Sequence, residues 1–323
     1  MQYRRLGRSG LEVSAIGLGT NAFGSRADKD TSIAVVRRAL DLGVNLIDTA
    51  DIYSDTRSEE ILGEALAGRR ADAVLATKAG FAVKDAPNRR GGSRQHLLRS
   101  VEDSLRRLRT DYIDLFQVHL YDPFTPVEET LRTLDDLVHQ GKIRYVGTSN
   151  YAAWQLALAL GESRLHELVR FESIQASYSL ADRTVEQELQ PLCVHERVSL
   201  LPYYPLAGGI LTGKYGTGAA PSGSRAQKDP SFARRLDPER VAFARDVEVL
   251  AREANTTTAA LSIAWLMGRP AVACVIVGAT SPEQLESNLA ALDVVLGESL
   301  RAALDARSLP YRDDPPFAAY RLE

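Results

Sequence analysis

With 323 residues, of which 45% are hydrophobic and 25% charged, the chain has the composition of a globular protein with a large buried core. Its formal net charge is −3, and its 39 basic residues are dispersed, which argues against nucleic acid or an anionic membrane as a main partner. No apolar run approaches a membrane span, no apolar leader segment follows the opening arginines, and two cysteines are too few for a disulfide scaffold. We therefore expect a cytoplasmic protein with reduced thiols, and a monomer by default.

The first predicted element is a β-hairpin over residues 3–14, YRRLGRSGLEVS, in which a glycine-centred turn separates two short strand-like pieces. Eight apolar segments of strand length follow it, separated by segments with helical periodicity. These segments are residues 15–20, 44–49, 73–78, 114–119, 144–149, 172–177, 198–204 and 273–279.

Three of the predicted helices have clear start signals, and one of them also has a clear stop signal. In the helix predicted over residues 93–109, Ser93 is the N-cap, and Leu97, Val101, Leu105 and Leu108 share one face. The next, over residues 125–141, is expected to have Thr125 as N-cap, Pro126 at its first position, Glu128 completing a capping box and Gly141 as its stop. The last, over 281–296, begins with Ser281 and a proline.

Eight strands that alternate with helices predict an α/β protein, a closed (β/α)₈ TIM barrel, whose competitor is an open doubly wound sheet. Such barrels often exceed 250 residues as one unit, so we expect a single domain over residues 1–323. The hairpin is expected to close one end of the barrel. Long loops, including the Gly-, Pro- and Ser-rich segment from Gly208 to Phe232, are expected to cover the C-terminal face, where barrel active sites lie.

The residues that end the strands are therefore the candidates for a functional site, and most of them are polar. They are Thr20, Asp48, Lys78, His119, Ser149 with Asn150, Gln175, Tyr203 and Gly278. Each residue alone could have a structural role, such as a helix cap or a surface ion pair. Their occurrence at one rim favours a shared function.

Three of these polar residues, together with Tyr53, suggest acid–base chemistry on an oxygen. Tyr53 follows Asp48 by five residues, and a tyrosine of ordinary pKa near 10 is a poor acid unless a cation stabilises its phenolate. Lys78, one of only six lysines among the 39 basic residues, can be that cation, with Asp48 holding the ammonium. His119 could bind a substrate oxygen. The set suits carbonyl reduction or alcohol oxidation.

Several blocks of the chain resemble the aldo-keto reductase superfamily. They are LIDTADIYSDTRSEEILGEAL, Thr77–Lys78, DYIDLFQVH, GKIRYVGTSNY, IQASYSL and PLAGGILTGKY, in order along nearly the whole chain. The resemblance implies a catalytic tetrad of Asp48, Tyr53, Lys78 and His119, with Tyr53 as the general acid or base. It also implies a nicotinamide cofactor bound across the rim, and it includes the superfamily branch of channel β-subunits.

The resemblance also implies a set of cofactor-binding residues. Ser149, Asn150 and Gln175 match positions that hold the carboxamide, Tyr203 matches the aromatic that stacks on the nicotinamide, and Thr20 and Asp48 complete that end. Leu206, Gly208, Lys214 and Arg225 belong to a loop expected over the pyrophosphate. At the adenosine end lie Gly278, Thr280, Gln284 and Asn288, together with a helix N-terminus at Ser281. The Lys-Ser pair and the arginine that many members place around a 2′-phosphate are replaced by Gly278, Ala279 and Gln284. NADP(H) is favoured, and NAD(H) is possible.

The substrate is expected to be a small carbonyl compound or sugar, in a pocket lined by Asn21, Phe23, Phe81 and Tyr121. Two other functions remain open at this point. One is a metal-dependent barrel hydrolase with Asp48, Asp51 and His119 as ligands, although such barrels usually carry more histidines at strand ends. The other is a cofactor-sensing regulatory subunit with little turnover. No metal is expected in the favoured reading.

Overall fold

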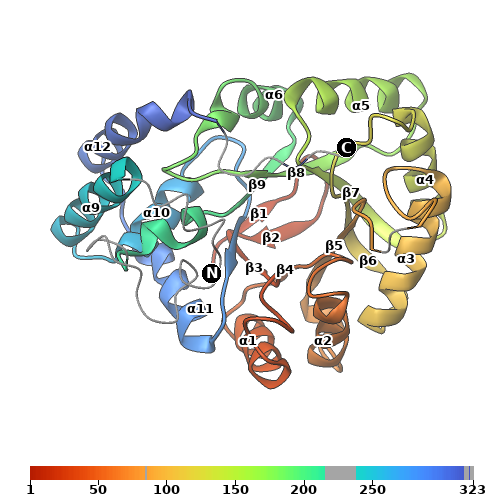
Figure 1. Ribbon diagram of the computed structural model, residues 1–323, viewed down its shortest axis with the longest axis horizontal. Coiled ribbons are helices and arrows are strands. Elements are labelled where there is room, and N and C mark those ends of the chain that lie inside the picture. The colour runs from red at the N-terminus through yellow and green to blue at the C-terminus, as the bar shows by residue number, and fades with distance from the viewer. Residues whose placement is uncertain (84–85, 215–237, 316–319, 321–323) are drawn as a thin grey trace.

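Eight parallel strands form a barrel with helices around it, as the sequence predicted (Figure 1). The computed structural model describes residues 1–83, 86–214, 238–315 and 320. Along the sheet the strands follow the order β10-β3-β4-β5-β6-β7-β8-β9. Their bounds are β3 Ile16–Gly19, β4 Leu46–Asp48, β5 Val74–Ala79, β6 Ile113–Val118, β7 Ile143–Ser149, β8 Phe171–Ser177, β9 Ser199–Tyr203 and β10 Val275–Gly278.

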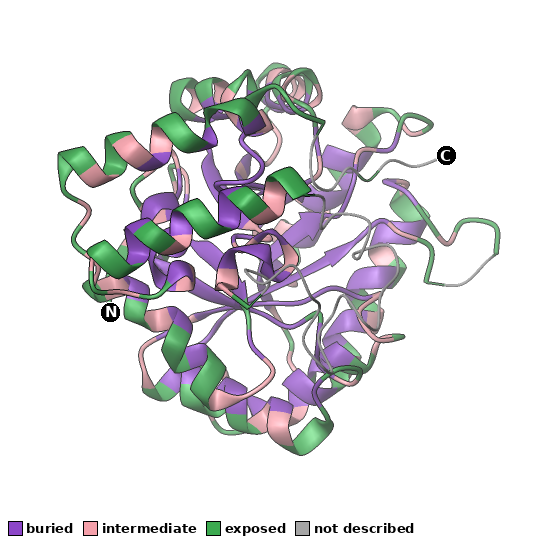
Figure 2. Ribbon diagram, turned by 60° about the vertical axis from the view of Figure 1, so that its left-hand side comes forward, coloured by how far each residue is buried: buried purple, intermediate pink, exposed green. Residues whose placement is uncertain are grey.

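The barrel closes between β9 and the residues that lead into β10. Leu200 N–H donates to the carbonyl of Ala271 at 2.8 Å, and Ala273 N–H donates to the carbonyl of Leu200 at 3.2 Å. Nearly every residue of the strands is buried, and the outward faces of the helices are exposed (Figure 2). Because a parallel barrel is covered on both faces, its strands can be continuously apolar, which is the pattern in the sequence.

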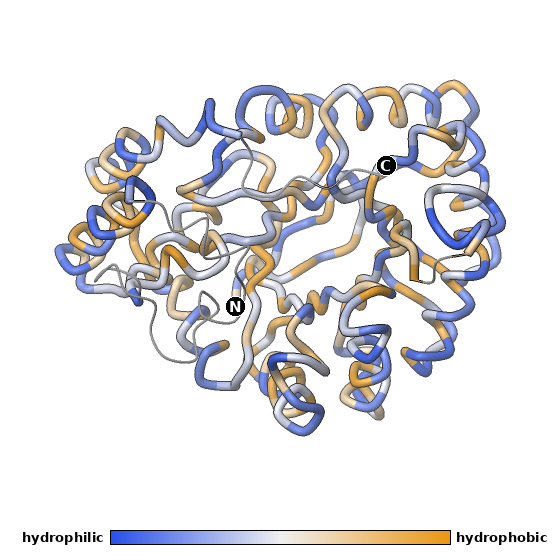
Figure 3. The backbone as a smooth tube through the Cα atoms, in the orientation of Figure 1, coloured by the Kyte–Doolittle hydropathy of each residue, from blue (hydrophilic) through white to orange (hydrophobic). Residues whose placement is uncertain are grey.

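Helices follow the strands and cover the outside of the barrel, apolar toward the sheet and polar toward solvent (Figure 3). Helix α9 lies outside the simple alternation, between β9 and α10. The helices are α1 Lys29–Asp41, α2 Arg57–Ala65, α3 Arg94–Leu108, α4 Val127–His139, α5 Ala153–Leu165, α6 Leu189–Glu196, α9 Pro238–Glu253, α10 Thr258–Met267, α11 Pro282–Leu289 and α12 Glu298–Ser308. In the part of the chain that the structure describes, no helix is long and apolar enough to cross a membrane.

The N-terminal hairpin fills one end of the barrel, as expected. Strand β1 (Tyr3–Arg5) pairs antiparallel with β2 (Glu12–Ser14). Leu6 and Val13 are fully buried in a cluster with residues from the first halves of several barrel strands, including Leu46 and Leu115. The opposite, C-terminal rim is therefore the end at which a ligand can enter.

The predicted helix signals held in two cases and failed in one. Ser281 caps α11, its hydroxyl accepting the N–H of Gln284, and Ser93 is the N-cap residue of α3 although its side chain makes no capping bond. The capping box at Thr125 was wrong, because α4 begins one residue later with Pro126 as N-cap. The Thr125 hydroxyl donates instead to Asp122 at 2.7 Å, since that carboxylate organises the preceding loop.

Helix α3 buries a histidine that makes stability depend on pH. Burial lowers the pKa of His96 from 6.5 to about 4. The folded protein therefore binds fewer protons than the unfolded chain, and the free energy of unfolding should fall as pH drops from about 6.5 to 4, by up to about 1.4 kcal/mol per pH unit from this group. We expect His96→Gln to reduce that slope in urea unfolding measured at several pH values, with exposed His139→Gln as control. An unchanged slope in His96→Gln would contradict the assignment.

Candidate active site

The polar residues that the sequence places at strand ends meet at the C-terminal rim of the barrel. Asp48 is the last residue of β4, Lys78 lies near the end of β5, and His119 directly follows β6. Because these three strands are neighbours in the sheet, their ends lie side by side. Tyr53 comes from the loop between β4 and α2.

A buried ion pair forms the base of the site. Lys78 and Asp48 are 1% and 3% exposed, and Lys78 Nζ lies 2.7 Å from Asp48 Oδ2. The ammonium also donates to the carbonyl of Thr49 at 2.8 Å and to the Tyr53 hydroxyl at 3.4 Å, so all three of its protons have acceptors. Burial by itself would lower the pKa of Lys78, but Asp48 and Tyr53 outweigh it and raise that pKa. The site therefore holds a fixed positive charge beside a phenol.

Two glutamine side chains hold the other oxygen of Asp48. Gln117 Nε2 donates to Asp48 Oδ1 at 3.1 Å, and Gln175 Nε2 donates to the same oxygen. Gln117 was not singled out from the sequence, although a signal existed. It lies two residues before His119 in a buried strand, so it faces the same side of the sheet as His119.

An unusual turn brings Tyr53 back over the rim. The three residues that follow it, Ser54, Asp55 and Thr56, all have left-handed backbone conformations, with φ of 53°, 54° and 73°. Non-glycine residues in this region store strain and often occur at functional sites. Burial, only partly offset by Lys78, raises the pKa of Tyr53. The phenol is therefore protonated at neutral pH and can donate a proton.

His119 is buried, neutral and short of partners. Burial, reinforced by the charge of Lys78, holds its pKa well below the ordinary value. Its Nδ1 has no hydrogen-bond partner among the described residues. The rings of Tyr53 and Phe81 meet the imidazole edge to face, with centroids 6.0 and 4.7 Å away, and Tyr320 packs on Phe81 at 6.0 Å. Phe81, a predicted pocket residue, thus lies against His119, and Tyr320, which sequence reasoning missed, packs on Phe81 from a position near the C-terminus.

A chain of hydrogen bonds links the ends of β6, β7 and β9. The Tyr203 hydroxyl donates to Asn150 Oδ1 at 2.7 Å, and Asn150 Nδ2 donates to the carbonyl of His119 at 2.9 Å and to Ser149 Oγ at 3.0 Å. Asn150 has a left-handed backbone, φ 59°, and its N–H binds the carbonyl of Gln175. The structure therefore brings Ser149, Asn150, Gln175 and Tyr203 together beside the Asp48–Lys78 pair.

At the end of β10 the predicted residues also lie together, but several bind one another. Gln284 Oε1 accepts both the N–H and the hydroxyl of Thr280, at 2.8 and 2.9 Å. Asn288 Nδ2 donates to the carbonyl of Gly278 at 3.2 Å, which ties α11 to the strand end. A β-carbon added at Gly278 would meet open space. The strand end is thus accessible, with the N-terminus of α11 beside it.

The loop predicted over the pyrophosphate is described only in its first part. Leu206 precedes a 3₁₀ segment, η3 (Ala207–Thr212), in which Gly208 has φ 67° and the N–H of Gly209 binds the carbonyl of Leu206. Lys214 is exposed at the last described position of this loop. Arg225 lies outside the described residues.

Two residues predicted to touch a ligand have other roles. Thr20 has no exposed surface, and its hydroxyl donates to the carbonyl of Asp48 and bonds to Ser58. It therefore braces the rim instead of facing a ligand. Phe23 is likewise 0% exposed and belongs to the main hydrophobic core, so it does not line an open pocket.

The other two predicted pocket residues lie at the surface. Asn21 is exposed and accepts a hydrogen bond from Arg26. Tyr121 is half-buried and packs edge to face against Tyr151 and Trp154.

The geometry does not suit the alternative of a metal-dependent hydrolase. Asp48 already binds an ammonium and two amides, and Asp51 lines a separate cavity. Within the described ranges, no group of three or more His, Cys, Asp or Glu side chains is placed to hold a metal ion.

Comparisons with known proteins show that the chain belongs to the aldo/keto reductase family. The sequence profile of the Aldo/keto reductase family matches residues 15–308. A "Probable voltage-gated potassium channel subunit beta" of Arabidopsis thaliana is 38% identical over 303 residues, which cover 91% of this chain and 92% of that protein. "Aldo-keto reductase YhdN" of Bacillus subtilis is 36% identical over 295 residues, covering 89% and 87%. "Uncharacterized oxidoreductase YrpG" of the same bacterium is 34% identical over 316 residues, covering 94% and 95%.

Proposed function

Because this chain belongs to the aldo/keto reductase family, we propose that it is a nicotinamide-dependent oxidoreductase that reduces aldehydes or ketones to alcohols, or catalyses the reverse reaction. The observation that best supports this proposal is the buried Asp48–Lys78 pair, with Lys78 Nζ 3.4 Å from the Tyr53 hydroxyl. A phenol beside a fixed ammonium can give a proton to a carbonyl oxygen or take one from an alcohol. A bound nicotinamide would supply or accept the hydride.

The side chains at the rim fit a carboxamide. Gln175 Nε2 is held by Asp48, and no described residue donates to Gln175 Oε1, so this oxygen is left to accept a carboxamide N–H. The Ser149 hydroxyl accepts from Asn150 and keeps its own proton to donate. The Tyr203 phenol is fixed by Asn150, which sets the orientation of its ring. These groups would orient the reacting ring above Asp48 and Lys78.

In this proposal, Tyr53 transfers the proton, and Lys78 and Asp48 support it. Tyr53 would hold the proton at its hydroxyl until the carbonyl oxygen becomes basic, and Lys78 would then stabilise the phenolate. Asp48, fixed by Gln117 and Gln175, keeps the ammonium in place. Neutral His119 can hydrogen-bond the substrate oxygen without competing as an acid, because its pKa lies well below the ordinary value. A small carbonyl compound or sugar is the proposed substrate class.

We propose NADP(H) as the favoured cofactor, with NAD(H) also accepted. The N-terminus of α11, with the Ser281 hydroxyl and the Gln284 amide beside it, provides uncharged donors for a phosphate. Glu283 lies in the first turn of α11, where Ser281 and the helix backbone lower the pKa of its carboxyl group, and the negative charge of this carboxylate would oppose a phosphate. Preference for NADP(H) should therefore be modest.

The test is a fluorescence titration of the purified protein with NADPH and with NADH, followed by addition of an aryl aldehyde while absorbance of the reduced nicotinamide is recorded. We expect both cofactors to bind, NADPH more tightly by no more than about tenfold, a difference of about 1.4 kcal/mol. Reduced cofactor should then be consumed. Failure to bind either cofactor would refute the proposal.

A second candidate function follows from one of the relatives. The 38% identity to a protein named as a probable potassium channel β-subunit supports, as a second proposal, a cofactor-sensing regulatory subunit. The same titration separates the two functions. Tight cofactor binding without consumption over a broad panel of carbonyl compounds would favour the regulatory subunit.

A further inference from the structure

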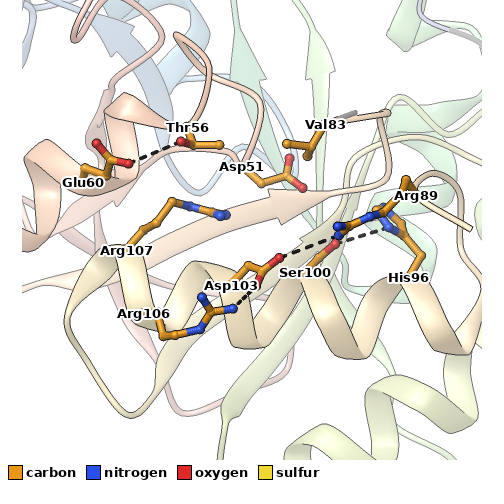
Figure 4. A pocket seen from close by; sticks show the side chains of 10 residues that line it. All are labelled: Asp51, Thr56, Glu60, Val83, Arg89, His96, Ser100, Asp103, Arg106 and Arg107. Atoms are coloured by element: carbon orange, nitrogen blue, oxygen red, sulfur yellow. Dashed lines mark hydrogen bonds and ion pairs between the residues drawn. The ribbon is translucent and has the colours of Figure 1, made fainter. Parts of the chain in front are cut away.

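A cavity that none of the proposed catalytic residues lines lies behind the loop that carries Tyr53. It has a volume of about 320 Å³ and is bordered by the loop after β4, the first turn of α2, the segment after β5 and helix α3 (Figure 4). Its lining residues are Asp51, Thr56, Glu60, Val83, Arg89, His96, Ser100, Asp103, Arg106 and Arg107. None of these belongs to the proposed tetrad or to the cofactor-binding set, and α11, with the proposed cofactor phosphate site, follows β10 on a different part of the barrel.

Two buried polar side chains in this cavity lack partners. Asp51 is 1% exposed, and neither of its carboxyl oxygens has a hydrogen-bond partner among the described residues. His96 is 2% exposed, and its Nε2 is also without a partner there. A buried polar group left unsatisfied costs about 1–3 kcal/mol. Two such groups in one cavity point to a ligand that satisfies them.

The guanidinium groups around the cavity indicate the charge of that ligand. Arg107 and Arg89 extend toward the space below Asp51 from opposite sides (Figure 4). Arg107 donates a hydrogen bond from Nε to the Glu59 carboxylate and another from Nη2 to the Ser104 hydroxyl. In the described chain, the ion-pair partner of Arg89 is Asp103 at 4.0 Å, a carboxylate that Arg106 also binds. Arg89 and one edge of Arg107 are therefore placed to bind an anion.

The protonation states of the two unpartnered groups agree with an anionic ligand. Burial, reinforced by the charge of Glu59, holds the pKa of Asp51 well above its usual range, although Arg107 and Lys78 oppose this. Burial, with Arg89 and Arg99 nearby, lowers the pKa of His96 to about 4. A protonated carboxyl is a donor, and a neutral imidazole can present an N–H.

We propose that this cavity binds a phosphate-type oxyanion, a free phosphate or the phosphate of a small metabolite, between Arg89 and Arg107, with Asp51 sharing a proton with it. Bidentate contact with guanidinium groups is the usual recognition of such an oxyanion. Asp51 can either donate its proton to a ligand oxygen or accept one from a hydrogen phosphate. The backbone N–H of Asp51 donates to the carbonyl of Lys78 at 3.0 Å, so the site adjoins the strand end that carries the proposed catalytic lysine.

The test is calorimetric titration of the protein with inorganic phosphate in a phosphate-free buffer at pH 7. We expect saturable binding, and an increase of about tenfold or more in Kd for Arg89→Gln, the value of one lost charge-assisted contact. Arg90→Gln is the matched control, because Arg90 is an exposed neighbour that does not line the cavity, and its Kd should stay near wild type. Arg89 is partly exposed, so its replacement should leave folding intact.

A second variant tests the shared proton. Asp51→Leu, which removes both oxygens, should abolish binding, whereas Asp51→Asn should retain part of it. No saturable heat with the wild-type protein, or equal affinity in wild type and Arg89→Gln, would overturn the proposal. Phosphate bound at the α11 N-terminus would give the latter result. Binding is measured without turnover, so this outcome is independent of the proposed oxidoreductase activity.

Discussion

Replacing Tyr53 with phenylalanine should lower kcat for carbonyl reduction by about 10²–10⁴-fold, the range associated with a positioned general acid. The substitution removes one hydroxyl, whose contact within the described residues is Lys78 Nζ at 3.4 Å, and keeps the ring that meets His119 edge to face. Cofactor affinity, followed by fluorescence titration, should therefore remain near that of the wild type. The measurement is single-turnover consumption of NADPH with a saturating aldehyde.

Tyr203→Phe is the matched control for this experiment. It also removes one phenolic hydroxyl at the rim, but that hydroxyl binds Asn150 in the group proposed to hold the carboxamide. We expect weaker cofactor binding with a much smaller loss of kcat at saturation. If Tyr53→Phe kept kcat within about threefold of wild type, Tyr53 could not be the acid that the tetrad requires.

Replacing Lys78 with methionine should strongly reduce the free energy of unfolding. The variant leaves the Asp48 carboxylate buried without its ammonium, and breaking a buried ion pair in this way typically costs about 3–5 kcal/mol. Two amides would still donate to Asp48, but no group would neutralise its charge. Urea unfolding should show the loss, and turnover should be abolished.

A double variant separates charge from packing. In Lys78→Met with Asp48→Asn the buried negative charge is gone, while an oxygen remains to accept from Gln117 and Gln175. We expect this protein to recover most of the lost stability and none of the activity. If the double variant were no more stable than Lys78→Met alone, the cost would have to come from altered packing around residue 78 and not from an uncompensated charge.

The barrel could be predicted from the sequence because two independent signals agreed. Eight apolar strand-like segments alternated with periodic helices, and seven of the eight strand ends were polar. Position at a strand end was enough to place Asp48, Lys78 and His119 at one rim, because parallel strands all end on the same face. It was not enough to assign roles, as Thr20 illustrates: its hydroxyl is used within the protein, on the carbonyl of Asp48.

The wrong predictions concern residues whose roles depend on tertiary contacts that the local sequence does not reveal. Phe23 follows a strand end, but its ring enters the core, and nothing in the local sequence distinguishes a loop aromatic that faces the core from one that faces a pocket. Thr125 has the sequence signature of an N-cap, but Asp122 competes for its hydroxyl. Gln117 could have been found, since a polar residue inside a buried strand needs a partner.

The contacts that surround Asp48 connect residues far apart in the sequence. Lys78 is 30 positions away, Gln117 is 69 and Gln175 is 127. Such long-range contacts form only after large loops have closed, which is slow and late in folding. The site therefore cannot exist in a half-barrel or in an early intermediate that has helices but no closed sheet. During refolding, recovery of turnover should lag behind recovery of the helical circular dichroism signal. The time course of enzymatic activity would then report when the barrel closes.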